Sequence, residues 1–191
     1  MSHYALTALA NSLPATVPFV GPETQERALG RGFAARLGAN ESTFGPSPRA
    51  LKAMVQAAAG VWQYGDPENH GLKQALAAHH NIDPDHITLG EGIDGLLLTL
   101  TRLTVASGDA ILTSHGAYPT FNYHAAGNGG TMHMVPYLDD HEDPQSLAEQ
   151  AHLLDAKLVY FANPDNPMGS WYNADTVQRL IDTLPSSCLL V

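Results

Sequence analysis

The sequence has 191 residues, of which 44% are hydrophobic and 15% charged, and its formal net charge is −10 at pH 7. This composition is typical of a globular protein with a sizeable core and excludes an intrinsically disordered chain. The nine Lys and Arg residues are scattered, which argues against nucleic acid or an anionic membrane as a partner, because both require clustered positive charge.

The N-terminal residues fit neither a signal peptide nor a membrane span. Residues 1–23 are moderately apolar, but they contain three prolines and lack a basic start, so we expect an arm that lies on a partner surface. Arg102 interrupts the apolar run at 96–105 well before the roughly 20 residues that a membrane span requires. The only cysteine, Cys188, gives no disulfide framework, and we expect a cytoplasmic protein.

Residues 1 to about 45 are rich in loops, and a helix with an early proline follows at 45–59. From residue 82 onward, short apolar runs alternate with helical patterns. The expected strands lie at 87–90, 110–114, 131–137 and 157–162, with a further strand beginning at 188–191. The expected helices lie at 93–103, 119–126, 143–151 and 173–184. Short apolar runs separated by helices are typical of parallel strands buried on both faces, so the sequence predicts a doubly wound, mostly parallel α/β sheet.

Three of the predicted strands are followed by unusual residues. These are GEGID at 90–94, HGAYPTF at 115–121 and NPDNPMG at 163–169. In a doubly wound sheet, ligands bind outside the carboxyl ends of the strands, so we expect the three segments to meet at one crevice.

Each segment has a functional interpretation and a structural alternative. The glycines of GEGID precede a helix whose free N–H groups could bind an anion, or they could serve the geometry of a tight turn. The ring of Tyr118 could pack on a planar ligand, or it could cover the end of the sheet. Asn166 precedes a proline and could present its amide to a ligand, or it could reflect the turn preference of Asn and Pro.

The ten histidines do not form a metal-binding motif. His79 and His80 are adjacent, and His115, His124 and His133 are separated by expected element boundaries. The sequence has no H-x-x-x-H or Cys-His spacing and no nucleophile elbow, so we expect no metal site.

Five segments in series resemble the front part of a fold-type I pyridoxal-phosphate-dependent aminotransferase of class I/II. They are LGANESTFGPSP, YGDPENHGLKQALA, GEGID, GAYPTF and NPDNPMG, and together they are most similar to the histidinol-phosphate aminotransferase group. The resemblance covers about residues 36–191. It implies that residues 1–40 are an N-terminal arm and the start of a small domain. Residues 41–191 would then be the front part of a cofactor-binding large domain, incomplete at its C-terminus.

The resemblance also implies roles for individual residues toward pyridoxal 5'-phosphate. The backbone amides of Gly92, Ile93 and Asp94 would hold the cofactor phosphate. Tyr118 would stack on the pyridine ring, and Asn166 would hydrogen-bond the phenolic oxygen.

Three further residues would act at the borders of the site. Tyr64 would reach the phosphate of the neighbouring subunit's cofactor, which implies a homodimer with shared active sites. Asn40 and Glu41 would border the substrate.

The sequence departs from the family pattern at several positions. Met168 stands where the family usually has Thr, Gln63 stands where Arg is usual, and Ile93 and Gly95 differ from the usual phosphate loop. The resemblance therefore implies transfer of an amino group between an amino donor, which would be histidinol phosphate or an aromatic or other amino acid, and a 2-oxo acid. The alternatives are a decarboxylase or lyase of the same fold, a non-catalytic cofactor-binding module, and a plain α/β scaffold.

The family's Schiff-base lysine has no counterpart among Lys52, Lys73 and Lys157. The first two lie in expected helices outside the crevice, and Lys157 lies at the opposite end of its strand. The sequence ends at Val191, in the strand where the family places an Asp that pairs with the pyridine nitrogen. We therefore expect a longer parent enzyme, and we expect these 191 residues alone to be inactive.

Overall fold

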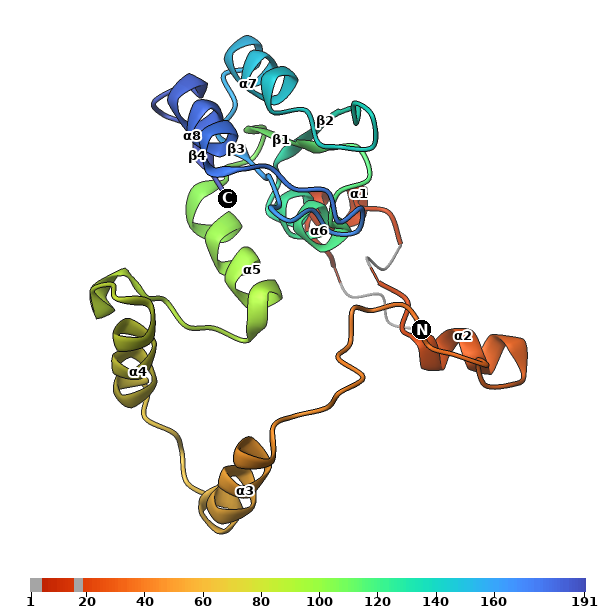
Figure 1. The fold of residues 1–191 in the computed structure, drawn as a ribbon. Helices are drawn as coiled ribbons and strands as arrows, with labels where there is room; N and C mark the ends of the chain where they lie inside the picture. Colours follow the sequence, from red (N-terminus) through yellow and green to blue (C-terminus); the bar gives the residue numbers. More distant parts are fainter. Residues whose placement is uncertain (1–4, 16–18) are drawn as a thin grey trace. The chain divides into compact units, whose positions relative to one another are not determined.

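A computed structural model describes residues 5–15 and 19–191 (Figure 1). Residues 1–4 and 16–18 of the predicted N-terminal arm lie outside the described residues. The chain divides into two compact units. The first contains Glu91–Val191 and the N-terminal segment up to Phe19, and the second contains Val20–Gly90.

The second unit is helical and contains no strand. Its α-helices are α2 (Pro22–Leu29), α3 (Pro48–Ala57) and α4 (His70–His80), and short 3-10 helices lie at Ala58–Gly60 and Pro84–His86. The helix predicted at 45–59 begins at Pro48, because the Ser47 hydroxyl accepts a hydrogen bond of 3.1 Å from the Ala50 N–H and caps the helix there. Arg36 forms ion pairs with Glu23 and Glu26.

The strand predicted at 87–90 is wrong. These residues follow the 3-10 helix at Pro84–His86 in an irregular conformation, and the described residues offer them no strand to pair with. An apolar run becomes a strand only when its backbone joins a hydrogen-bonded ladder, which periodicity alone does not reveal.

The first unit contains a parallel sheet of four strands in the order β2-β1-β3-β4. The strands are β1 (Ala110–Ser114), β2 (Thr131–Val135), β3 (Leu158–Val159) and β4 (Leu189–Leu190). The predicted strand 131–137 ends before Pro136, which has no backbone N–H to donate. The regular part of β3 is shorter than predicted. Its pairing with β1 continues by one backbone hydrogen bond beyond each end, from the Lys157 N–H to the Ala110 carbonyl and from the Tyr160 N–H to the Leu112 carbonyl.

The described part of the first unit contains five helices. They are α1 (Ala8–Ser12), α5 (Gly92–Thr104), α6 (Pro119–Gly127), α7 (Pro144–Leu153) and α8 (Ala174–Thr183). The last four confirm the predicted helices to within a few residues. Asp143 caps α7 as expected, because its carboxylate accepts the Gln145 and Ser146 N–H groups and Pro144 occupies the first turn.

Both faces of the two central strands, β1 and β3, are buried. Neighbouring residues of a strand point to opposite faces, so Ile111 and Leu112 belong to different clusters. Leu112 packs in one cluster with Leu147 of α7 and Leu180 of α8. Ile111 packs in the other with Leu97 of α5 and Phe121 of α6.

Each fully buried side chain of this size stabilises the fold by about 1.5–3 kcal/mol. Helices on both faces of a parallel sheet confirm the predicted doubly wound α/β class. None of the helices within residues 5–15 and 19–191 has the length and apolar character needed to cross a bilayer.

Candidate functional site

The N-terminus of α5 is open to an anion. Gly92 begins the helix with a φ of 69°, a left-handed conformation that favours glycine, and a Cβ placed on it would meet no atom within 4 Å. Glu91 at the N-cap position makes no side-chain hydrogen bond to the first turn. Among residues 5–15 and 19–191, no side chain accepts from the first N–H groups of this 13-residue helix, at the end where the helix dipole is positive.

Tyr118 lies beside this helix end. It occupies the N-cap position of α6, and its hydroxyl donates a hydrogen bond of 2.8 Å to Asp94 Oδ1 in the first turn of α5. The pKa of Tyr118 is raised because burial and the Asp94 carboxylate outweigh a hydrogen bond with Thr120 that lowers it. The structure therefore brings together two predicted cofactor residues that are 24 positions apart in the sequence.

The third predicted segment forms a closed loop after β3. Asn163 donates to the Tyr172 carbonyl at 3.0 Å and accepts from the Tyr172 N–H at 2.9 Å, which closes the base of the loop. Inside it, the Gly169 N–H donates to the Asp165 carbonyl at 2.9 Å, and Gly169 takes a left-handed φ of 75°. Asn166 is half-buried within this inner turn. Both Asn-Pro peptide bonds of the loop are cis.

Two buried carboxyl groups that the sequence did not reveal belong to this region. Asp165 lies in the inner turn of the loop, and the carbonyl of Glu142 accepts a hydrogen bond from the Tyr172 hydroxyl at the end of the loop. Glu142 is 1% exposed and Asp165 is 5% exposed. Asp165 lies inside a recognised motif, but Glu142 stands in the polar run DDHEDP, where no periodicity marks one acid as buried.

The remaining predicted residues belong to the second unit. Tyr64 is fully exposed, and Asn40 and Glu41 lie in an exposed turn in which Asn40 has a φ of 52°. The roles of these three residues stay predictions.

The three lysines lie where the sequence placed them. Lys52 is in α3 and Lys73 in α4, both in the second unit. Lys157 directly precedes β3, whereas Asn166 follows that strand, so the two residues stand at opposite ends of it. No group of three or more His, Cys, Asp or Glu side chains suited to a metal occurs within the described ranges.

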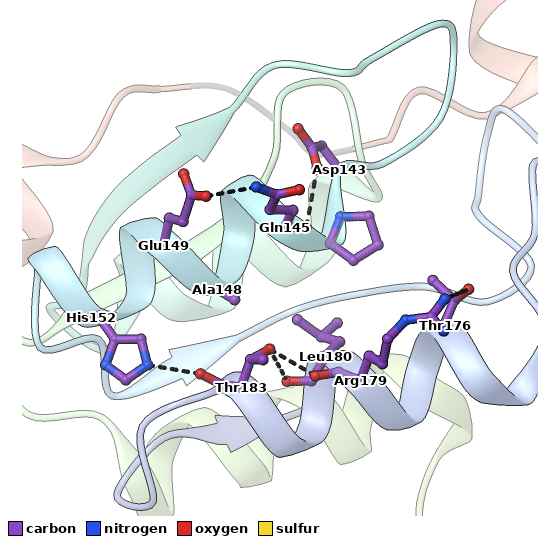
Figure 2. Close-up of a pocket in the computed structure, with 10 residues that line it drawn as sticks. Asp143, Gln145, Ala148, Glu149, His152, Thr176, Arg179, Leu180 and Thr183 are labelled. Carbon is purple, nitrogen blue, oxygen red and sulfur yellow. Dashed lines mark hydrogen bonds between the residues drawn. The ribbon is translucent and has the colours of Figure 1, made fainter.

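A groove of about 580 Å³ lies elsewhere in the first unit, between α7 and α8 (Figure 2). Ala148 and Leu180 line it, and the bond of 2.7 Å between His152 Nε2 and the Thr183 carbonyl joins the two helices at one end. The groove contains none of the predicted site residues, and its polar side chains bond mainly to one another or to the helix ends.

Comparisons with known proteins identify a family and similar structures. Residues 35–191 match the sequence model of the family "Aminotransferase class I and II". The chain is 34% identical over 181 residues to the histidinol-phosphate aminotransferase of Anaeromyxobacter sp. (strain Fw109-5), covering 94% of this chain and 50% of that protein. It is 29% identical over 177 residues to the enzyme of the same name from Staphylococcus haemolyticus, covering 92% of this chain and 50% of that protein.

A similar solved structure is histidinol-phosphate aminotransferase from Sinorhizobium meliloti in complex with pyridoxal-5'-phosphate. It superimposes with a TM-score of 0.93 at 53% identity, covering 99% of this chain and 50% of that one. The chain thus spans about half the length of the relatives it matches.

Proposed function

Because the chain belongs to the class I and II aminotransferase family, we propose that the protein carrying it is a pyridoxal-phosphate-dependent aminotransferase. It moves an amino group between an amino donor and a 2-oxo acid. The observation that carries the proposal is the bond of 2.8 Å from Tyr118 to Asp94, which fixes an aromatic ring beside the uncapped start of α5.

The residues present fit the cofactor. A phosphate needs several N–H donors and a positive local field, and the first turn of α5 offers both. A pyridine ring needs a flat apolar surface, and the half-buried ring of Tyr118 lies next to that turn. We propose that Gly92, Ile93 and Asp94 hold the phosphate through their backbone N–H groups and that Tyr118 stacks on the ring.

Asn166 completes the part of the site that these residues form. We propose that its side-chain amide donates to the phenolic oxygen of the cofactor, held by a loop whose two ends are tied through Asn163 and Tyr172. When bound, pyridoxal phosphate supplies the electron sink for breaking and forming bonds at the α-carbon of the amino donor. The residues of this chain bind and orient it, and the proton-transferring lysine is proposed to lie outside these 191 residues.

Histidinol phosphate is the amino donor that we propose, and a 2-oxo acid is the acceptor. The support is similarity, since the relatives of 29% and 34% identity and the solved structure of 53% identity all carry the name histidinol-phosphate aminotransferase. Met168, Gln63 and Ile93 differ from the usual family residues, so aromatic and other amino acids remain the competing donors.

We further propose a homodimer in which Tyr64 reaches the partner's cofactor phosphate. The fully exposed rings of Tyr64 and Phe44 support a surface that a second subunit covers. We assign residues 41–191 to the large domain and residues 1–40 to the arm and small domain, and the family match, which starts at residue 35, supports this. The unpaired thiol of Cys188 suits a reducing cytoplasm, the compartment we propose.

A binding and activity assay tests the proposed function. Pyridoxal phosphate is titrated into the purified protein and followed by visible absorbance, and the protein is then assayed with histidinol phosphate and, separately, with aromatic amino acids. The proposal expects saturable binding that Tyr118→Ala weakens, and transamination by the full-length protein with histidinol phosphate preferred. Saturable binding without any amino-group transfer by the full-length protein would instead indicate a non-catalytic module.

A further inference from the structure

Glu142 connects three parts of the first unit that meet at the carboxyl ends of the strands. Its Oε2 accepts a hydrogen bond of 2.7 Å from the Ser114 hydroxyl at the end of β1. Its Oε1 accepts a bond of 3.1 Å from the Ala162 N–H after β3. Its backbone carbonyl accepts a bond of 2.7 Å from the Tyr172 hydroxyl at the end of the loop.

Asp165 holds the inner turn of the same loop. Its N–H donates to the Ser170 carbonyl at 2.8 Å, and its carbonyl accepts from the Gly169 N–H at 2.9 Å. Its Oδ2 accepts a bond of 2.9 Å from the Tyr137 hydroxyl, which follows β2. The two backbone bonds close a turn that contains Asn166, the next residue in the chain.

One oxygen of this site lacks a donor. Asp165 Oδ1 is fully buried and receives no hydrogen bond from any residue in the described part of the chain. The ion pairs among those residues are the two of Arg36 in the second unit, so neither Glu142 nor Asp165 has a cationic partner there. Two buried carboxylates without a cation are costly, and an acceptor left without a donor adds a further penalty.

We propose that Glu142 and Asp165 share one proton, with Glu142 as a neutral acid that donates to Asp165 Oδ1, and that this bond positions Asn166. A bond from O–H to a carboxylate is of the strong, charge-assisted kind. It satisfies the unpaired oxygen and removes one of the two buried charges. The part that concerns Asn166 rests on the proposed cofactor role of that residue.

The surroundings of the pair favour its protonated form. Burial, followed by the effect of the Asp165 carboxylate, raises the pKa of Glu142 to about 7, although the bonds from Ser114 and Ala162 oppose the rise. Burial raises the pKa values of Tyr137, Tyr160 and Tyr172, so these phenols stay neutral.

Two further titratable groups flank Glu142 in the chain. The Asp143 carboxylate caps α7, and the exposed ring of His141 lies 5.8 Å from the ring of Tyr172. His141 directly precedes Glu142 in the chain, so it needs a control of its own.

The chain offers a reporter for the loop. Trp171 lies in it, is 67% exposed and is one of only two tryptophans, so Trp62→Phe leaves it as the sole tryptophan. We expect its fluorescence, in cofactor-free protein, to change with a midpoint near pH 7 as Glu142 gives its proton to solvent. Glu142→Gln, which is neutral at every pH, is expected to lose this transition, whereas His141→Gln is expected to keep it.

A direct view of the proton comes from the infrared carbonyl band of a protonated carboxylic acid. We expect the unmodified protein to show this band at about pH 6 and to lose it by about pH 9. Asp165→Asn removes the neighbouring charge, so the band is expected to disappear at a lower pH. If Glu142→Gln fails to fold, the unmodified protein and Asp165→Asn still decide the question. Absence of the band at pH 6, or a fluorescence transition that survives Glu142→Gln, would overturn the shared proton.

Cofactor binding separates this proposal from the proposed function. We expect the dissociation constant of pyridoxal phosphate to rise above neutral pH more steeply in the unmodified protein than in Glu142→Gln. The same pH dependence in both proteins would overturn the positioning of Asn166 while leaving the shared proton intact. Failure of both proteins to bind pyridoxal phosphate at any pH would contradict the proposed function instead, and the cofactor-free measurements would stand.

Discussion

Tyr118 donates a hydrogen bond of 2.8 Å to Asp94, and this bond joins the start of α6 to the first turn of α5. Two helices that are separated in the sequence by β1 are thereby joined near their N-termini. The hydroxyl of Tyr118 therefore holds the two helices together, whereas its ring is the part proposed to contact the cofactor.

Removal of the hydroxyl and removal of the ring are expected to differ in effect. Tyr118→Phe loses one hydrogen bond, and we expect cofactor binding to weaken by about 1 kcal/mol, roughly fivefold. Tyr118→Ala also loses the stacking surface, about 0.5–1.5 kcal/mol more. Dissociation constants for pyridoxal phosphate check this order, and Tyr123→Ala, an exposed aromatic of the same helix, is the control. Equal affinities in all three variants would remove Tyr118 from the site.

The two asparagines of the loop are expected to separate cofactor contact from loop structure. Asn166→Ala is expected to shift the visible absorbance of bound cofactor while leaving the fold intact. Asn163→Ala loses two bonds to the Tyr172 backbone, and we expect it to lower the free energy of unfolding by about 1–2 kcal/mol. Absorbance spectra and urea unfolding measure the two effects. An unchanged spectrum in Asn166→Ala would show that its amide does not touch the cofactor.

The stability of the protein is expected to fall between mildly acidic and neutral pH through Glu142. Its pKa is raised from 4.5 to about 7 on folding, so the folded state holds the proton more tightly than the unfolded state. The resulting stabilisation is complete below 4.5 and is lost as the pH rises through about 7. The loss is at most about 3 kcal/mol.

Urea unfolding at a series of pH values checks this sign. Glu142→Gln should lack the contribution, so the difference between the unmodified protein and the variant isolates it from other titrating groups. A constant difference across the pH range would contradict the raised pKa.

Gly130 is expected to be intolerant of a side chain. A Cβ there would lie 2.8 Å from Ile111 Cγ1 and 3.1 Å from the Ala125 carbonyl oxygen, in the core between α6 and β1. We expect Gly130→Ala to destabilise the fold by about 1–3 kcal/mol, the usual effect of overpacking. Gly127→Ala is the matched control, since a Cβ there meets nothing within 4 Å. Thermal unfolding compares the two variants. Equal unfolding midpoints would mean that the neighbouring side chains move and accommodate the added methyl group.

Tyr64 provides the test of shared sites. Tyr64→Phe is expected to weaken cofactor retention in the homodimer because a phosphate contact from the partner is lost. Mixed dimers that pair a Tyr64→Phe subunit with a subunit lacking the Asn166 amide decide between contact across the interface and contact within one subunit. If Tyr64 acts across the interface, one site of each mixed dimer stays normal and the other carries both losses. A loss in each of the two sites would mean that Tyr64 acts within its own subunit.

The sequence predicted most of the first unit because its elements carry local signals. Asp143 and Pro144 mark the start of α7, and alternation of apolar runs with helices indicates parallel strands. The strand predicted at 87–90 failed because a strand depends on a partner, which no local pattern supplies.

The candidate site was predictable to a similar degree. The segments of Asp94, Tyr118 and Asn166 were found through their glycines and prolines, but the bond between Tyr118 and Asp94 depends on how α5 and α6 pack. Glu142 was missed for the same reason. Its burial depends on Ser114, 28 residues earlier, and on Ala162, 20 residues later, and the run DDHEDP alone suggests an exposed loop.

The most direct test of the central claim follows the backbone amides of an isotope-labelled protein by nuclear magnetic resonance. Pyridoxal phosphate is added in one titration and pyridoxal, which lacks the phosphate, in another. We expect pyridoxal phosphate to produce its largest shifts at Gly92, Ile93 and Asp94 and pyridoxal to produce much smaller ones there. Shifts that leave these three amides unchanged and appear instead along α7 and α8, at the groove of Figure 2, would contradict it.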